Sequence, residues 1–269
     1  MPGTVVISGA STGIGRATAL RLAAAGFDVL AGVRREADAP QGTTPVALDV
    51  TDAAAIDALA QRIGDGQLAG LVNNAGIGVG GPVEHIPLGE WRRQFEVNLF
   101  GHVAMTRALL GALRAGGGRV VNIGSIGGRQ ALPLVSPYAA SKFALRGFSD
   151  SLRVELHRQG VRVALIEPGA IATEIWRKAD ESFQEIDGEL PPELAARYRR
   201  GLDGARKASR RAARQATPAD KVAAAVEHAL TARRPRAHYL VGADARGQAL
   251  IERLPAGARD RLLRLAFGI

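Results

Sequence analysis

The chain has 269 residues, a net charge of +9, 23% charged residues and no cysteine. This length allows one domain with a sizeable core, and the lack of cysteine excludes a disulfide framework and a thiolate nucleophile. The N-terminus carries no basic leader, no apolar run reaches the ~18 residues of a membrane span, and the five histidines lack metal-ligand spacing, so we expect a cytoplasmic protein without a metal site.

Short apolar runs alternate along the chain with helix-length amphipathic segments. Runs that are apolar at successive positions are typical of parallel strands buried on both faces. The intervening segments, such as 15–26 and 218–230, predict helices. The pattern therefore predicts one α/β domain over 1–269, a doubly wound, Rossmann-like parallel sheet with helices on both faces. The predicted strands are 4–10, 28–33, 68–76, 119–125, 161–169 and 237–242.

A glycine-rich turn, SGASTGIG, follows the first predicted strand and opens a helix. Glycine at positions 9, 13 and 15 permits a tight turn and lets backbone N–H groups approach a pyrophosphate, which a helix N-terminus attracts. The spacing is G-x-x-x-G-x-G, not the usual G-x-G-x-x-G. In its strand-to-helix setting the turn nevertheless indicates a dinucleotide.

The end of the second predicted strand bears on the choice between NAD and NADP. In such sheets an acid about 20 residues after the glycine turn binds the ribose 2′-hydroxyl of NAD, whereas an arginine accommodates the 2′-phosphate of NADP. Here the strand carries Gly32 near its end and has no acid at that point. Arg34 and Arg35, which follow, offer guanidinium groups that can bind phosphate. The sequence favours NADP, and Glu36 keeps NAD open.

The stretch SPYAASKFALRGF, residues 136–148, places Tyr138 and Lys142 four residues apart in a helix-prone run. Residues four apart lie on one face of a helix, so the phenol and the ammonium group point into the same space. By spacing alone such a pair is most often an ordinary surface feature. A surface accident and a proton-transfer device therefore both remain open at this point.

The last third of the chain is less regular and strongly basic. We interpret residues 174–217 as a substrate lid, because the strand and helix alternation loosens there. From Arg197 onward 17 Lys/Arg stand against 6 Asp/Glu, yet only 4% of all residues are aromatic and no nucleic-acid motif is present, so we expect no nucleic-acid binding. Residues 254–269 predict a basic amphipathic helix, for which packing is a better explanation than contact with a membrane surface.

Taken in order, the motifs resemble those of the short-chain dehydrogenase/reductase family, in its compact single-domain branch. SGASTGIG is similar to the family's cofactor loop, with Ser8 in place of the usual threonine, and LDV, NNAG and PGAIAT are similar to its adenine, fourth-strand and nicotinamide segments. A finer resemblance, to 17-beta-hydroxysteroid and retinol dehydrogenases, rests on residues 124–148 and 234–242. The positions that match the catalytic tetrad are Asn98, Ser125, Tyr138 and Lys142.

The resemblance implies an enzyme that transfers a hydride between NADP, or NAD, and a ketone or secondary alcohol. Tyr138 would exchange the proton, Lys142 would lower its pKa and bind the nicotinamide ribose, Ser125 would bind the substrate oxygen, and Asn98 would hold a water chain at the lysine. The implied cofactor residues are Gly9, Ser11, Thr12, Gly13, Ile14, Gly15, Arg34, Arg35, Asp49, Val50, Asn73, Asn74, Ala75, Gly76, Tyr138, Lys142, Pro168, Gly169, Ile171 and Thr173.

Several alternatives accompany this interpretation. Asn73 and Asn98 could satisfy buried backbone groups, and Asp49 could cap a helix, although Thr51 and Asp52 are better placed for that. The substrate would be apolar, like a steroid or retinol, or another carbonyl compound. The alternative function is a non-catalytic regulator that senses NADP, which the intact tetrad disfavours. The long helices predicted at 90–113 and 138–156 pair between subunits in the family, which implies a homodimer or homotetramer, or else they simply cover the sheet.

Overall fold

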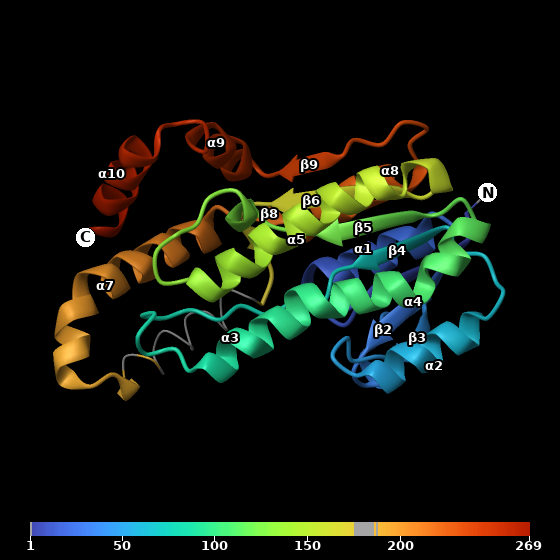
Figure 1. Cartoon of the computed structure of the whole chain (residues 1–269), viewed down its shortest axis with the longest axis horizontal. Helices are drawn as coiled ribbons and strands as arrows, with labels where there is room; N and C mark the ends of the chain where they lie inside the picture. Colours follow the sequence, from blue (N-terminus) through green and yellow to red (C-terminus); the bar gives the residue numbers. More distant parts are fainter. Residues whose placement is uncertain (1, 175–185, 187) are drawn as a thin grey trace.

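Parallel strands form the central sheet of the computed structural model, which describes residues 2–174, 186 and 188–269 (Figure 1). Their order is β3-β2-β1-β4-β5-β6-β9, and every neighbouring pair is parallel. The doubly wound sheet predicted from the sequence is confirmed, with β3 as a strand that the apolar runs did not reveal. The strands are β1 (Thr4–Ser8), β2 (Asp28–Val33), β3 (Thr44–Ala47), β4 (Gly70–Asn73), β5 (Arg119–Ile123), β6 (Arg162–Pro168) and β9 (His238–Val241).

Both faces of the sheet are covered by helices, which explains why the strands are apolar at successive positions. In β1, Val5 and Ile7 face a cluster that includes Leu22 and Val226, whereas Val6 faces a second cluster that includes Met105. Helices α1 (Gly13–Ala24) and α8 (Ala219–Thr231) cover the first face, and α2 (Ala53–Ile63), α4 (Gly101–Ala115) and α5 (Ser136–Glu155) cover the second. Short 3₁₀ turns occur at η1 (Glu36–Asp38), η3 (Ile126–Gly128) and η4 (His157–Gln159).

The helix predicted over 90–113 is present and contains a π turn near its middle. Helix α3 (Leu88–Phe95) continues through a π turn at Glu96–Phe100 into α4 without a break in helical backbone. Single π turns inside α-helices are frequent at functional sites. This one contains Asn98.

Part of the carboxyl-terminal third extends beyond the end of the sheet (Figure 1), and a separate apolar cluster there includes Leu202 and Phe267. Among its described residues, the segment interpreted as a loose lid contains the long helix α7 (Pro192–Arg214), which packs against α10 (Ala256–Phe267). A two-stranded ribbon of β7 (Ile171–Ala172) and β8 (Thr217–Pro218) leads into and out of this region, and α9 (Ala243–Ile251) follows β9. Ile175 and Trp176 of the expected lid lie outside the described residues. Within the described part of the chain, no helix is long and apolar enough to cross a membrane.

Candidate active site

The glycine turn after β1 is packed so closely that side chains cannot replace its glycines. Gly9 adopts φ +67°, a left-handed conformation that favours glycine. A Cβ on Gly15 would lie 2.1 Å from the carbonyl oxygen of Gly9 and 2.4 Å from the amide nitrogen of Asn74. Thr12 makes no side-chain cap at the start of α1, and the first turn of that helix holds no acid. The helix N-terminus can therefore receive a phosphate group, which fits the dinucleotide expected from the sequence.

Polar contacts join the ends of β1 and β4 beside this turn. The hydroxyl oxygen of Ser8 accepts hydrogen bonds from the N–H groups of Asn74 and Ala75, at 3.0 and 3.1 Å. The amide of Asn74 donates to the carbonyl oxygens of Ser8 and Gly9, both at 3.0 Å. A serine in place of the usual threonine thus keeps the hydroxyl that holds residues 74 and 75 in position.

The two arginines after β2 differ in what surrounds them. Arg35 binds Asp38 through two hydrogen bonds of 2.9 Å, whereas in residues 2–174, 186 and 188–269 no hydrogen bond or ion pair holds the exposed Arg34. Arg34 is therefore the guanidinium group that remains available for a phosphate. Asp49 accepts hydrogen bonds from the backbone and hydroxyl of Thr51, which lower the pKa of its carboxyl group.

The structure decides the capping role that the sequence left open for Asp49, and it also places Val50. Asp52, not Asp49, caps α2 by accepting a hydrogen bond of 2.9 Å from the N–H of Ala54. The side chain of Val50 is buried in the core, where a Cβ on Gly101 would approach its Cγ2 to 2.8 Å.

The segment expected at the nicotinamide faces the glycine turn. A Cβ on Gly13 would lie 3.1 Å from the Cγ2 of Thr173, so residues 168–173 and the glycine turn border the same space. The N–H of Gly169 donates to the carbonyl oxygen of Val241 at 2.9 Å, and the N–H of Ala170 donates to Asp244 at 2.6 Å. Asp244 was missed in the sequence because it lies beyond the motif-bearing region, at the start of α9.

Three buried side chains of the α3 to α4 helix bind the backbone that follows β4. Gln94 accepts from the N–H of Val79 at 2.7 Å and donates to the carbonyl oxygen of Ile77 at 2.9 Å. Asn98 accepts from the N–H of Ile77 at 2.8 Å and donates to its carbonyl oxygen at 3.0 Å. The Nε2 atom of His102 lies 2.8 Å from the carbonyl oxygen of Ala75.

Asn73, by contrast, lies within the core. Its amide nitrogen donates to Thr106 at 3.0 Å and to Asn122 at 2.9 Å, and the residue is fully buried. This is the structural role that the sequence left open for Asn73. Asn98 also ties buried backbone, but its amide further approaches the hydroxyl oxygen of Ser141, at 3.3 Å, one residue before Lys142.

His102 should make the folded protein sensitive to acid. Burial and the charge of Lys142 lower the pKa of His102 to about 3, although the hydrogen bond with the carbonyl of Ala75 acts to raise it. The unfolded chain, with an ordinary histidine pKa of about 6.5, binds the proton first, so stability falls as the pH drops below 6.5. Between pH 7 and pH 5 this loss is about 2 kcal/mol.

Urea unfolding of the wild type and His102→Asn at both pH values measures this effect. The wild type should lose more stability on acidification than the variant, in which residue 102 no longer titrates. Equal losses in the two proteins would contradict a neutral buried His102.

The expected catalytic side chains converge at the amino-terminal end of α5. Lys142 is buried and donates to the carbonyl oxygen of Ile123 at 2.9 Å, and its Nζ lies 5.9 Å from the centre of the Tyr138 ring. Ser125 begins the η3 turn by accepting from the N–H of Gly127 at 3.0 Å. Gly76 of the NNAG motif lies beside this group. A Cβ placed on Gly76 would be 3.5 Å from the Oδ1 atom of Asn98 and 4.0 Å from the Nζ atom of Lys142.

The electrostatics of the pair differ from the expectation that Lys142 lowers the pKa of Tyr138. Burial raises the pKa of Tyr138, and only a hydrogen bond with Ser125 opposes this. Burial also lowers the pKa of Lys142 to about 8, because an ammonium group loses solvation there. Tyr138 is therefore a protonated phenol at neutral pH, next to a lysine that is still mostly charged.

A family model described as short chain dehydrogenase matches residues 3–183, about two thirds of the chain. The chain belongs to the short-chain dehydrogenase family. It is therefore an oxidoreductase that acts on CH–OH groups with NAD or NADP. The alternative of a non-catalytic regulator finds no support among these matches.

Named relatives cover most of the chain. An NADPH-dependent 3-dehydrocapnine reductase of Ornithobacterium rhinotracheale is 36% identical over 88% of this chain and 87% of its own length. Retinol dehydrogenase 5 of Mus musculus is 37% identical over 90% of this chain and 81% of its own. A short chain dehydrogenase from Burkholderia cenocepacia, solved in complex with NADP, is 28% identical with a TM-score of 0.76 and covers 97% of each chain. The similarity to retinol dehydrogenases expected from the sequence is confirmed.

Proposed function

We propose that this chain is an NADP-dependent enzyme that interconverts an apolar ketone and a secondary alcohol. The observation that carries this proposal is the grouping of Ser125, Tyr138 and Lys142 beside Gly76 and the glycine turn, at the carboxyl ends of the strands. Ligands bind at this end of doubly wound sheets, at the point where the strand order reverses. That reversal lies here between β1 and β4.

The chemistry follows from the protonation states of these side chains. The nicotinamide ring, when bound, supplies or accepts the hydride. Tyr138 donates its proton to the carbonyl oxygen in reduction, for which a raised pKa keeps it protonated at neutral pH. The hydroxyl of Ser125 donates a hydrogen bond to the same oxygen, and the ammonium group of Lys142 would bind the nicotinamide ribose. Alcohol oxidation runs through the same groups in reverse.

The choice of NADP rests on Arg34. This arginine is exposed and unpaired within the described residues, whereas Asp38 already binds Arg35. A relative named as NADPH-dependent and a structural neighbour in complex with NADP support this choice. Two further residues would contact the bound cofactor. Asp49 would lie beside the adenine, and Thr173, which is close to Gly13, would lie farther along the cofactor.

Replacing Arg34 with alanine should weaken NADPH binding by about 10- to 100-fold, the effect of losing one charged hydrogen-bonding partner of about 1.5–3 kcal/mol. Binding of NADH, which has no 2′-phosphate, should change little. Isothermal titration calorimetry with both cofactors measures this difference. Arg35→Ala is the matched control, because that arginine is held by Asp38, and it should retain NADPH affinity. Equal losses for NADH and NADPH in Arg34→Ala would contradict a phosphate site at Arg34.

An apolar substrate is supported by the cluster that adjoins the site. Leu132 and Leu134 belong to the loop before Tyr138 and pack with side chains of α7 and α10. A relative named retinol dehydrogenase 5 has a substrate of matching character. The region 174–217, which contains α7, would then act as the substrate lid. A panel of ketones of increasing chain length, assayed with NADPH, tests this: kcat/KM should rise with apolar length.

We further propose that the chain forms a homodimer or homotetramer through α4 and α5. Phe100, Phe143 and Val154 are exposed apolar residues on or next to these helices, at 51%, 43% and 68% of their surface. Burial of such side chains against a second copy would remove them from water. The cytoplasmic location expected from the sequence stays a prediction.

A further inference from the structure

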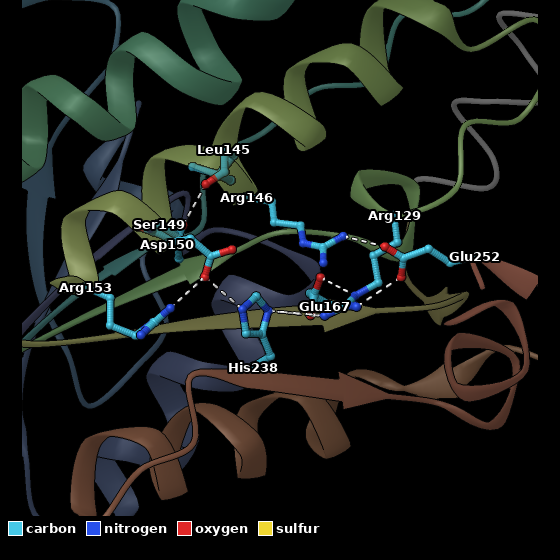
Figure 2. A network of polar contacts seen from close by, with 10 residues as sticks. Arg129, Leu145, Arg146, Ser149, Asp150, Arg153, Glu167, His238 and Glu252 are labelled. Carbon is cyan, nitrogen blue, oxygen red and sulfur yellow. Dashed lines mark hydrogen bonds and ion pairs between the residues drawn. The ribbon is translucent and has the colours of Figure 1, made fainter. Parts of the chain in front are cut away.

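Glu167 is a fully buried carboxylate at the end of β6, directly before Pro168. Burying a carboxylate is costly unless both of its oxygens are bonded. Here the Nε and Nη2 atoms of Arg129 donate to the two oxygens at 2.7 Å each, and the Nδ1 atom of His238 donates at 2.9 Å (Figure 2). Burial alone would raise the pKa of Glu167, but the bonds from His238 and Arg129 outweigh it and the pKa lies below its ordinary value.

Arg129 links Glu167 to the turn that carries Ser125. The N–H of Gly128 donates to the carbonyl oxygen of Ser125 at 2.9 Å, which closes the turn directly before Arg129. The backbone of this turn is pressed against α5, because a Cβ on Gly128 would lie 2.7 Å from the carbonyl oxygen of Lys142. Its orientation is therefore set from one side by α5 and from the other by the pair of Arg129 and Glu167.

His238 extends this link to α5 itself. Its Nδ1 atom lies 2.9 Å from Glu167 and its Nε2 atom lies 2.9 Å from Asp150, which stands on α5 (Figure 2). Ionised carboxylates only accept hydrogen bonds, so both ring nitrogens must carry a proton and the imidazole is positively charged. The pKa of His238 is raised, first by the hydrogen bond to Glu167 and further by Asp150, against the effect of burial.

Further charged groups surround this link. The Nη2 atom of Arg129 lies 3.3 Å from Nδ1 of His238, and Arg153 binds Asp150 at 3.2 Å. Glu252, just after α9, accepts from Arg129 at 3.1 Å and from Arg146 at 2.9 Å. If His238 loses its proton, one of its nitrogens presents a lone pair to a carboxylate, so one of its two links must open.

We propose that Arg129, Glu167 and protonated His238 form a positioning device that holds the Ser125 turn, the Pro168 segment and α5 in the arrangement needed for proton and hydride transfer. None of the three touches the reacting atoms in this proposal, so they are positioning residues. The proposal rests on the proposed function, because the arrangement that it fixes is that of the reductase site. It predicts a loss of kcat without a matching loss of cofactor binding.

Arg129→Lys tests the bidentate link, since lysine keeps the charge but cannot bond both oxygens in a fork. We expect kcat to fall by about 10- to 100-fold, the scale of a small misplacement of reacting groups. The dissociation constant for NADPH, from calorimetry, should change little, because the glycine turn and Arg34 are intact. The control is Arg93→Lys, which alters a bidentate pair with Glu90 on the exposed face of α3. It should leave kcat unchanged.

His238→Gln provides a second test, which holds even if Arg129→Lys does not fold. Glutamine carries both of its N–H donors on one nitrogen atom, so it cannot bond Glu167 and Asp150 from opposite sides as the imidazolium does, and the variant resembles the deprotonated histidine. The ratio of wild-type to variant kcat should be about tenfold at pH 6 and should fall toward one as the pH rises through the raised pKa of His238, where the wild type loses the same proton. A ratio that is constant with pH would overturn the proposal, because the effect of a merely structural role would not depend on the protonation of His238.

Amide hydrogen exchange separates this proposal from the proposed function. If the wild type reduces no carbonyl compound of the panel, the proposed function is wrong. Amide hydrogen exchange then tests the positioning role of Arg129, Glu167 and His238 by itself. In Arg129→Lys and His238→Gln, peptides that cover 124–130 and 166–170 should exchange faster than in the wild type and in Arg93→Lys. Unchanged exchange in both peptides would overturn the device independently of turnover.

Discussion

The variant Tyr138→Phe should reduce carbonyl compounds about 10³-fold more slowly than the wild type, within the range of ~10²–10⁴ for loss of a general acid. Burial keeps the phenol of Tyr138 protonated at neutral pH and the hydrogen bond with Ser125 holds it in place, so the phenylalanine ring lacks only the proton donor. Steady-state kcat with NADPH measures the effect, and the NADPH dissociation constant should be unchanged.

The matched control for this prediction is Tyr239→Phe. The Tyr239 hydroxyl is held 2.9 Å from His228 and accepts from the N–H of Arg236 at 3.0 Å, and its ring belongs to the cluster on the α1 and α8 face of the sheet. This variant loses buried hydrogen bonds but no acid, so it should unfold more easily and still turn over. A Tyr138→Phe enzyme that keeps more than a tenth of the wild-type kcat would mean that another group supplies the proton.

The variant Gly15→Ala should lose both stability and cofactor binding. The added Cβ would lie 2.1 Å from the carbonyl oxygen of Gly9 and 2.4 Å from the amide of Asn74. The first of these is backbone, so α1 must move away from the turn, at a cost of about 3 kcal/mol or more. Urea unfolding measures this cost, and calorimetry with NADPH should show no binding at concentrations that saturate the wild type.

Gly111→Ala is the control for the Gly15 variant. Gly111 lies in α4 with open space around its Cβ position, so alanine there should stabilise the protein by about 0.5–1 kcal/mol. NADPH affinity should be retained. If Gly15→Ala were as stable as the wild type and bound NADPH equally well, the close packing of α1 against the turn would not be a requirement of the site.

The sequence was most informative where a physical requirement is local. Strands buried on both faces must be apolar at successive positions, so Val5, Val6 and Ile7 predicted β1 and its two-sided packing. Helical spacing alone placed Tyr138 and Lys142 on one face of α5. These properties depend on neighbours within a few residues and can be read without any knowledge of the rest of the chain.

Contacts between distant segments could not be predicted in this way. Asp244 binds the backbone of Ala170 and packs on Gly169, yet it follows both by more than 70 residues. The raised pKa of Tyr138 depends on burial, which spacing does not report. The pair of Arg35 and Asp38 is local, by contrast, and the three-residue separation could have indicated it.

Helix α7 is a further element whose structure depends on packing against a distant segment. Its polar, charged composition made the segment look irregular in sequence, but its glycines make room for the end of the chain. A Cβ on Gly204 would lie 2.1 Å from the carbonyl oxygen of Phe267, and one on Gly201 would lie 3.4 Å from Ile269. The glycines that weaken the helical pattern are thus the ones that let α10 approach α7.

The π turn at Glu96–Phe100 acts as a correction of helical phase. Gln94, Asn98 and His102 are spaced by four residues, while the backbone that they bind advances by two, through residues 79, 77 and 75. Four helical residues rise ~6.0 Å and two residues of stretched chain advance ~6.6 Å, so the two step lengths nearly match.

The step lengths match, but the rotation of the helix does not match the stretched backbone of residues 75–79. In a regular α-helix each step of four residues overshoots a full turn by ~40°, so the third side chain would have rotated away from the backbone. The wider winding of the π turn offsets this drift. Replacing the π turn by regular α-helix with the same number of residues would rotate His102 by ~80° relative to Gln94, so the winding of the helix at this point constrains the site as strictly as the identity of Asn98.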